Sequence, residues 1–153
     1  MQHIRPLRPA VVVIWLLLGG GCVGPQVTSR NGALLPSRCP YEPDIPLPAG
    51  FKLADQSSED WSSGSIRYLR HRYGGRADKY AVRKFYREQM PLVRWTAISD
   101  SAVHGRLTMR FERADESCTV TIEEEPAGLS SRVVVEVKIA PLAHRPAAQT
   151  ERS

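Results

Sequence analysis

Three consecutive segments in the last third of this chain alternate apolar and polar side chains, and this alternation constrains the fold more than any other feature. The apolar positions are Leu107, Met109 and Phe111, then Cys118, Val120 and Ile122, then Val133, Val135, Val137 and Ile139. Because successive side chains of a β-strand point to opposite faces of a sheet, each segment predicts a strand with one apolar face. Three such strands need a second layer of structure to cover that face.

The loop length between the first two segments also predicts how their strands pair. An antiparallel hairpin keeps the apolar side chains on one face and brings Arg106 opposite Glu123 when one register is adopted. That register pairs Phe111 with Cys118, Met109 with Val120 and Leu107 with Ile122. We therefore expect an antiparallel meander.

An amphipathic segment predicts the covering layer. Asp78 can accept hydrogen bonds from the free amides at a helix start, and Pro91 prevents a helix from continuing beyond Met90. Between them, side chains recur at helical spacing, at Val82, Phe85, Tyr86 and Gln89. The sequence therefore predicts a helix over 79–90.

Two more segments, 64–73 and 95–99, are rich in β-forming residues and predict further strands. Together these elements predict an α+β fold with an antiparallel sheet of about five strands. The expected order is strand, helix, then four strands, with the one amphipathic helix packed on one face of the sheet.

The N-terminus carries a different kind of signal. Two arginines precede nine apolar residues, 10–18, which three glycines and Cys22 follow. This is the pattern of an export signal, and the apolar run is shorter than the roughly 20 residues that a membrane-spanning helix needs. We therefore expect a leader over 1–21 that is removed.

The end of this leader resembles the lipobox of bacterial lipoproteins, in which a small residue precedes a cysteine that receives a diacylglycerol. Gly21 is that small residue and Cys22 the lipidated position, although Gly19 stands where the lipobox prefers leucine. The resemblance implies cleavage before Cys22 and a protein anchored in the membrane by its N-terminal lipid. Ordinary secretion after cleavage by signal peptidase I is the alternative, with Cys22 as a stray thiol.

The resemblance also implies a location. A lipid-anchored domain faces an extracytoplasmic space, and more than one acyl chain is needed for durable attachment. Val23 follows Cys22, so the aspartate that resembles an inner-membrane retention signal is absent from the second mature position. We expect a cell-envelope protein, lipid-anchored in the outer membrane and facing the periplasm.

Composition divides the remainder of the chain. Residues 22–48 are rich in Pro, Gly and Ser and lack a period of two or 3.6, so we predict a tether. Residues 49–142 form the predicted α+β domain, and 143–153 are polar and predicted to be a disordered tail.

Three short motifs resemble an arrangement found in small uncharacterised bacterial envelope lipoproteins, in which a Phe-Tyr helix ends in Met-Pro and a tryptophan begins the next strand. The motifs are Leu47-Pro-Ala-Gly-Phe51, Phe85-Tyr-Arg-Glu-Gln-Met-Pro91 and Trp95. The resemblance implies a fold and no activity, and the same residues are explained equally well as core and helix stop.

The cysteines predict a disulfide. If Cys22 is lipidated, Cys39 and Cys118 remain in a compartment that permits oxidation. A bridge between them would pin the tether to the sheet. The alternative is that Cys118 is a small buried residue and Cys39 a free thiol.

Basic residues concentrate in the middle of the chain, where residues 64–94 hold nine Lys and Arg against two acidic residues. Lys79, Arg83 and Arg87 recur at every fourth position, so they form one stripe on the predicted helix. Like charges at this spacing oppose one another, and we therefore predict an anion-binding surface for lipid phosphates, acidic polysaccharide or an acidic protein. A solvated basic face is the alternative.

No motif predicts catalysis. The histidines of the mature chain are widely separated, and no Gly-x-Ser-x-Gly, Ser-x-x-Lys or phosphate-binding loop is present. Two isolated cysteines lack the ligand spacing of a zinc site, so we expect no metal and no cofactor. The acidic run 123–125 ends a strand and is expected to be solvated.

These observations favour a non-catalytic envelope module that binds partners or plays a structural role. The alternative is a small hydrolase of the cell wall or of lipids, because a nucleophile and a base can meet in space without a sequence motif. A nucleic-acid partner is not expected, because the export signal removes the chain from it.

Overall fold

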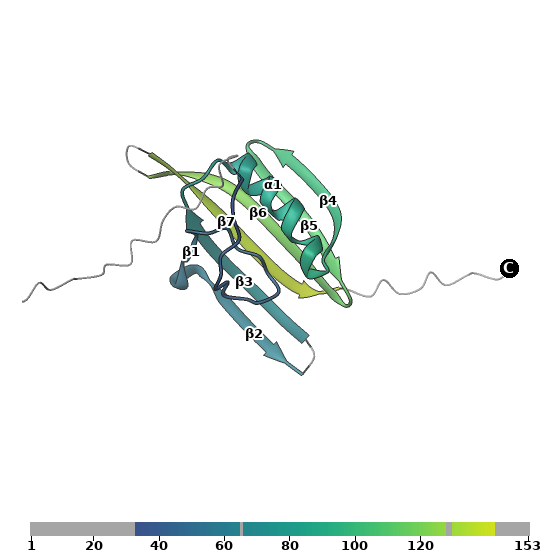
Figure 1. The fold of residues 1–153 in the computed structure, drawn as a ribbon. Helices are drawn as coiled ribbons and strands as arrows, with labels where there is room; N and C mark the ends of the chain where they lie inside the picture. Colours follow the sequence, from purple (N-terminus) through teal and green to yellow (C-terminus); the bar gives the residue numbers. More distant parts are fainter. Residues whose placement is uncertain (1–32, 65, 128–129, 143–153) are drawn as a thin grey trace, which may run out of the picture.

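The computed structural model describes residues 33–64, 66–127 and 130–142, and within this part of the chain seven strands form one antiparallel sheet (Figure 1). The strands are β1 (Lys52–Leu53), β2 (Glu59–Ser63), β3 (Ile66–Gly75), β4 (Thr96–Val103), β5 (Arg106–Arg113), β6 (Glu116–Ala127) and β7 (Ser130–Pro141). Helix α1 (Lys79–Gln89) lies between β3 and β4, and two short 3-10 helices are η1 (Asp55–Ser57) and η2 (Pro91–Val93). The predicted α+β class is confirmed.

The strand order across the sheet is β1-β3-β7-β6-β5-β4, and β2 also pairs with β3. Both β1 and β2 are antiparallel to β3, β1 at Tyr73 and Gly74 and β2 along 66–70. The prediction of about five strands is therefore wrong, because these two short strands were missed. All five residues of β2 are exposed, so no apolar alternation marks it, and β1 has only two residues.

The predicted hairpin register is confirmed. In β5 and β6, Leu107 is paired with Ile122, Met109 with Val120 and Phe111 with Cys118. These side chains are almost fully buried, and Arg106 at the end of the ladder forms an ion pair with Glu123 at 2.5 Å. Burial of one complete face fixes the register, because a slip of one residue would turn every apolar side chain to solvent.

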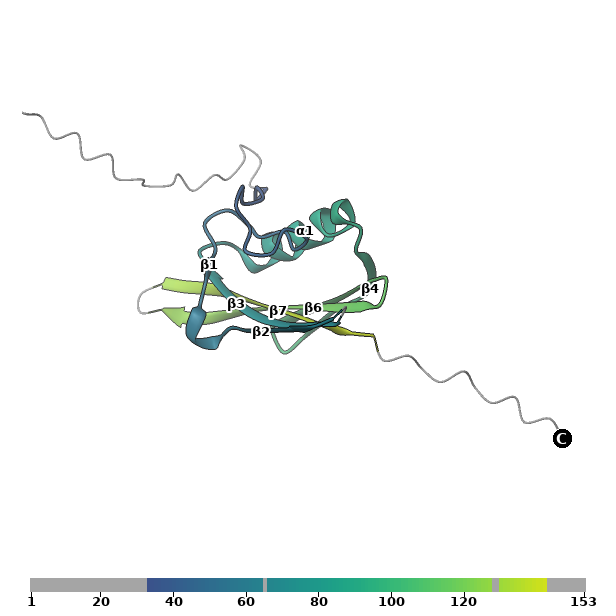
Figure 2. The same cartoon turned by 90° about the horizontal axis from the view of Figure 1, so that it is seen from below.

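Helix α1 packs on one face of the sheet, as Figure 2 shows from the edge. The Asp78 side chain accepts a hydrogen bond from the Ala81 amide at 2.8 Å, and Pro91 begins η2 just beyond the helix. Val82, Phe85 and Tyr86 are the buried residues of the helix. The predicted ends of the helix are therefore confirmed to within a residue.

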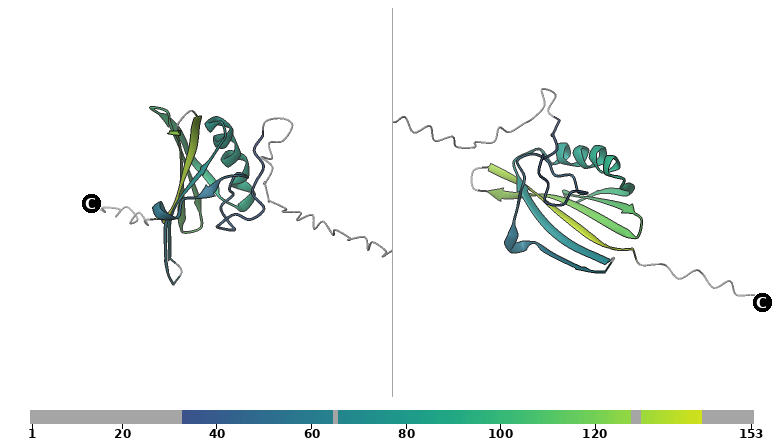
Figure 3. Two further views of the ribbon diagram at one scale, coloured as in Figure 1. Left: turned by 90° about the vertical axis from the view of Figure 1, so that its left-hand side faces the viewer. Right: turned by 60° about the horizontal axis from the view of Figure 1, so that its bottom comes forward.

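The segment 33–48, called here the docked segment, lies beside α1 on the same face of the sheet (Figure 3). Ile45 and Leu47 are 2% and 6% exposed and belong to the hydrophobic core. Pro36 and Pro48 form an isolated antiparallel β-bridge. Residues 33–48, which were predicted to belong to the tether, therefore pack on the domain. Buried apolar residues in an irregular segment recur at no fixed spacing, so the sequence pattern does not reveal that such a segment is packed.

Close packing at the start of the sheet explains one glycine. A Cβ atom on Gly75 would lie 2.5 Å from the ring of Phe51, so only glycine lets this ring pack against β3. Phe51 belongs to the core, which supports the structural interpretation of its motif. The predicted leader, Cys22 and the predicted tail 143–153 lie outside the described residues.

Candidate functional site

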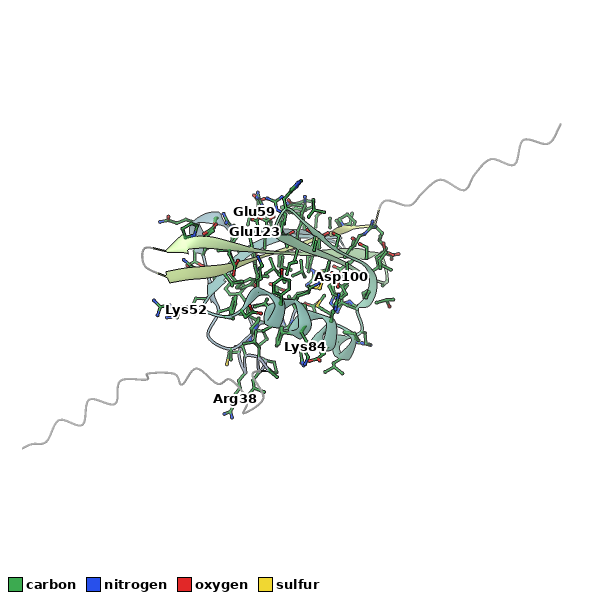
Figure 4. All side chains as sticks on the ribbon, turned by 90° about the horizontal axis from the view of Figure 1, so that it is seen from above. Arg38, Lys52, Glu59, Lys84, Asp100 and Glu123 are labelled. Atoms are coloured by element: carbon green, nitrogen blue, oxygen red, sulfur yellow. The ribbon has the colours of Figure 1, made fainter. Side chains whose placement is uncertain are left out.

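The face of the sheet opposite α1 is the candidate functional site, called here the uncovered face. Figure 2 shows α1 and the docked segment together on the other side, and Figure 4 shows Glu59 and Glu123 on the side away from Lys84 and Arg38. Residues of β3, β5, β6 and β7 that alternate with the core positions point to this face. They are mostly charged side chains and threonines, as expected for the solvated face of an antiparallel sheet.

Ion pairs between arginine and glutamate run across the uncovered face. Their nitrogen–oxygen distances range from 2.5 to 3.1 Å. The pairs are Arg70–Glu136, Arg72–Glu125, Arg106–Glu123 and Arg110–Glu112. The Lys138 ammonium lies 5.7 Å from the centre of the Tyr68 ring, so a cation–π contact extends the charged surface toward β2.

A depression of about 330 Å³ lies among these pairs. Its lining side chains include three arginines, two glutamates, a threonine and a valine. They are Arg70, Arg72, Arg106, Thr121, Glu123, Val134 and Glu136. The hydrogen bond to Glu136 raises the pKa of Arg70, so this guanidinium remains charged.

The depression offers charged groups of both signs to solvent. Exposed ion pairs contribute little to stability, about 0–1 kcal/mol each, so exchanging an internal partner for an external one costs little. An arginine fork can hold an external carboxylate in a bidentate manner, and the glutamates can accept external cations. The uncovered face therefore fits a surface that carries both signs of charge.

The predicted anion-binding stripe has internal partners. Lys79 forms an ion pair with Glu124 at 3.0 Å, and Arg83 and Arg87 both donate hydrogen bonds to Asp100. Two carboxylates from β4 and β6 thus hold the three cations against the sheet. The inference that internal stability does not explain the stripe is wrong, because the pairing charges lie on distant strands.

The arginines also affect the ionisation of Asp100. Partial burial raises the pKa of this carboxyl, but the hydrogen bonds from Arg83 and Arg87 outweigh that effect, and the pKa lies below its usual value. The hydrogen bond to Glu124 similarly raises the pKa of Lys79. These charges stabilise one another across the two layers.

The structure does not form the predicted disulfide. Cys39 is an exposed free thiol, and Cys118 is a buried free thiol. Cys118 stands between Phe111 and Ile139 on the covered face, where burial raises the pKa of its thiol to about 12. The alternative interpretation of both cysteines therefore fits the structure, whereas the bridge does not. The even number of cysteines and the oxidising compartment do not indicate whether each thiol is buried in the core or exposed to solvent.

The structure contains a half-buried cluster of charged side chains that was not predicted from the sequence. Arg67 forms ion pairs with Asp44 at 2.8 Å and with Glu116 at 3.0 Å, and Arg113 contacts the same two carboxylates. The Trp95 indole donates a hydrogen bond to the Asp44 carbonyl at 3.0 Å. This cluster locks the docked segment to the sheet. Its signal was Arg67 itself, which alternates in phase with the inward-facing residues of β3 and therefore needs an anionic partner.

Desolvation also shapes the ionisation of this cluster. Burial raises the pKa of Asp44, yet hydrogen bonds from Arg67 and Arg113 hold it below its usual value. The hydrogen bonds that Arg67 donates to Asp44 and Glu116 raise the pKa of Arg67. The cluster stays ionised, and loss of one partner would leave a partly buried charge without compensation.

His71 is the buried polar residue of the core and was not assigned a role from the sequence. Its Nδ1 lies 3.0 Å from the Tyr73 hydroxyl, and its Nε2 lies 3.9 Å from the Asp60 carboxylate. The Tyr41 ring packs edge-on against the imidazole. Burial lowers the pKa of His71, so the ring is neutral in the folded state at neutral pH.

The sequence matches no protein-family model, and comparison with curated proteins and with solved structures finds no similar one. Among the described residues, no cluster of three or more His, Cys, Asp or Glu side chains is arranged to hold a metal ion. No helix in the same part of the chain is long and apolar enough to cross a membrane.

Proposed function

We propose that this protein is a bacterial envelope lipoprotein, acylated at Cys22 and held at the outer membrane, whose domain is a non-catalytic binding module. The uncovered face is its binding surface, and the partner is a protein surface that carries both signs of charge. The observation that carries this proposal is the array of exposed arginine–glutamate pairs around a depression of about 330 Å³.

The arrangement of the layers supports this use. The docked segment and α1 occupy one face of the sheet, so the chain from the predicted anchor joins the domain there, and no described element covers the opposite face. Arginine is favoured at protein interfaces because its planar fork binds carboxylates in a bidentate manner. The threonines between the charged rows add hydroxyl groups that donate and accept.

The hydrolase alternative gains no support from the geometry around His71 and Cys118. His71 meets a tyrosine hydroxyl and a carboxylate and is enclosed by the core, and Cys118 is buried with a raised pKa. Neither arrangement presents an activated nucleophile to a substrate.

Mass spectrometry of the mature N-terminus tests the anchor. We expect cleavage after Gly21 and a diacylglycerol on Cys22, and we expect Cys22→Ala to leave the protein uncleaved at this site and unlipidated. Mature protein with an unmodified Cys22 thiol would overturn the anchoring half of the proposal.

Photo-crosslinking in intact envelopes tests the binding face. A photoreactive residue at Thr108, on the uncovered face, should capture a protein partner, whereas the same residue at the exposed position Lys84 of α1 should not. Combining Arg72→Glu with Arg106→Glu should abolish capture at Thr108, and Lys84→Glu with Arg87→Glu is the matched control. Equal capture from both faces, or capture that survives the reversal, would contradict this use of the face.

A further inference from the structure

We call the side of the molecule that carries α1 and the docked segment the helix side. It carries basic side chains that form no ion pair among the described residues. Arg76 and Arg94 stand in the two connections between α1 and the sheet, and Arg38 lies in the docked segment. All three are exposed, and none forms an ion pair among the described residues. They differ in this from Lys79, Arg83 and Arg87, whose charges meet carboxylates.

The helix side also exposes large apolar side chains. Leu92, in η2 beside Arg94, is 74% exposed, and Tyr80 of α1 and Tyr41 of the docked segment are each 58% exposed. Tyrosine is favoured where one end of a side chain meets an apolar medium and the other meets water. Apolar and aromatic groups among unpaired arginines are the composition of a surface that rests on lipid headgroups.

The path of the chain points to the same side. Ten residues separate Cys22 from residue 33, so the lipid and the domain are joined by at most about 40 Å of extended chain. Leu34 packs against the core and Pro36 bridges Pro48, so the described chain begins on the helix side. A lipid at Cys22 would therefore hold this side at high local concentration near a bilayer.

We propose that the helix side lies against an anionic lipid surface, with Arg38, Arg76 and Arg94 near the headgroup phosphates and Leu92 at the boundary of the acyl chains. The uncovered face then points away from the membrane. This inference rests on the proposed lipid anchor, and it replaces the stripe of Lys79, Arg83 and Arg87 with three arginines that form no ion pair with any described carboxylate.

The first experiment measures lipid binding without the anchor. The mature chain with Cys22→Ser is titrated with vesicles of phosphatidylcholine alone or mixed with phosphatidylglycerol. We expect binding only to the mixed vesicles, weakening as salt rises. Combining Arg38→Gln, Arg76→Gln and Arg94→Gln should lower the apparent affinity about tenfold or more, because each basic residue near an anionic surface adds to binding.

A matched control removes three positive charges from the uncovered face. Its substitutions are Arg72→Gln, Arg106→Gln and Arg110→Gln. Affinity should fall by less than about threefold, since a distant face loses only a screened interaction. Equal losses in both triple variants, or no preference for anionic vesicles, would overturn the proposal of a lipid-facing helix side.

The second experiment measures orientation on the acylated protein. In a Trp61→Phe background, Leu92→Trp places a fluorophore on the helix side, and the parent protein carries the exposed Trp61 on β2. Trp95 is 1% exposed and gives a constant background in both proteins. Brominated lipids should quench the tryptophan at position 92 strongly and Trp61 weakly or not at all.

The outcomes separate this inference from the proposed anchor. Acylated protein in which Trp61 is quenched and the tryptophan at 92 is not would refute the orientation and leave the anchor in place. Protein that carries no lipid at Cys22 by mass spectrometry would refute the anchor, and the vesicle titration of the Cys22→Ser chain would still decide whether the helix side binds lipid. Circular dichroism identical to that of the parent shows that each variant is folded.

Discussion

Replacing a buried tyrosine by phenylalanine should change the free energy of unfolding in opposite directions at two positions of this domain. Tyr86 is 0% exposed, and its hydroxyl has no hydrogen-bond partner among the described residues. A buried hydroxyl without a partner costs about 1–3 kcal/mol. Tyr86→Phe removes this cost and leaves a void of about one oxygen atom, which costs about 0.3 kcal/mol at roughly 24 cal/mol per Å³. We therefore expect Tyr86→Phe to raise the free energy of unfolding by about 0.7–2.7 kcal/mol.

Tyr73→Phe is the matched control. Tyr73 is 2% exposed, but its hydroxyl lies 3.0 Å from His71 Nδ1. Removing it leaves a buried imidazole nitrogen without its partner, so this substitution should lower the free energy of unfolding by about 1–3 kcal/mol.

Urea unfolding of the Cys22→Ser chain measures both changes. The midpoints should move in opposite directions with an unchanged slope, and 1 kcal/mol corresponds to about 0.3–1 M urea at ordinary slopes. A lower midpoint for Tyr86→Phe would show that its hydroxyl is satisfied in solution and would refute the reasoning.

Three further predictions follow from the buried and paired groups. Burial lowers the pKa of His71 in the folded state, so the unfolded chain binds more protons as pH falls below about 6.5. The stability that is present above this pH is therefore lost at lower pH. His71→Gln should flatten the dependence of the urea midpoint on pH. Asp100→Asn should lower stability by less than about 1 kcal/mol, and the difference should shrink in high salt because the pair is partly exposed. In the Cys22→Ser chain, a maleimide should label Cys39 in the folded protein and Cys118 only after unfolding, as counted by mass; labelling of both thiols before unfolding would contradict the burial of Cys118.

The parts of the fold that the sequence predicted have local or periodic causes. Asp78 and Pro91 bound α1 because one accepts amide hydrogen bonds and the other cannot continue a helix. The register of β5 and β6 follows from alternation and loop length together, since only one pairing buries Met109 against Val120 on the covered face.

The errors concern contacts between elements that no period relates. Arg83 and Arg87 are a repulsive pair when α1 is considered alone, and they become an attractive cluster only when Asp100 of β4 is brought beneath them. The disulfide prediction for Cys118 came from the even number of cysteines left after Cys22, although its alternation with Val120 and Ile122 already placed it on the buried face. For that cysteine, the periodic evidence was stronger than the evidence from compartment.

The docked segment connects the predicted anchor to the use of the two faces. A free tether ending at residue 48 would let the domain rotate, so either face of the sheet could meet the bilayer. Because Ile45 and Leu47 pack in the core and Asp44 binds Arg67, residues 33–48 are fixed to the domain, and a lipid at Cys22 would be attached from the helix side. The core contacts of this proline-rich segment, rather than the leader, would then place the helix side next to the bilayer and turn the uncovered face away from it.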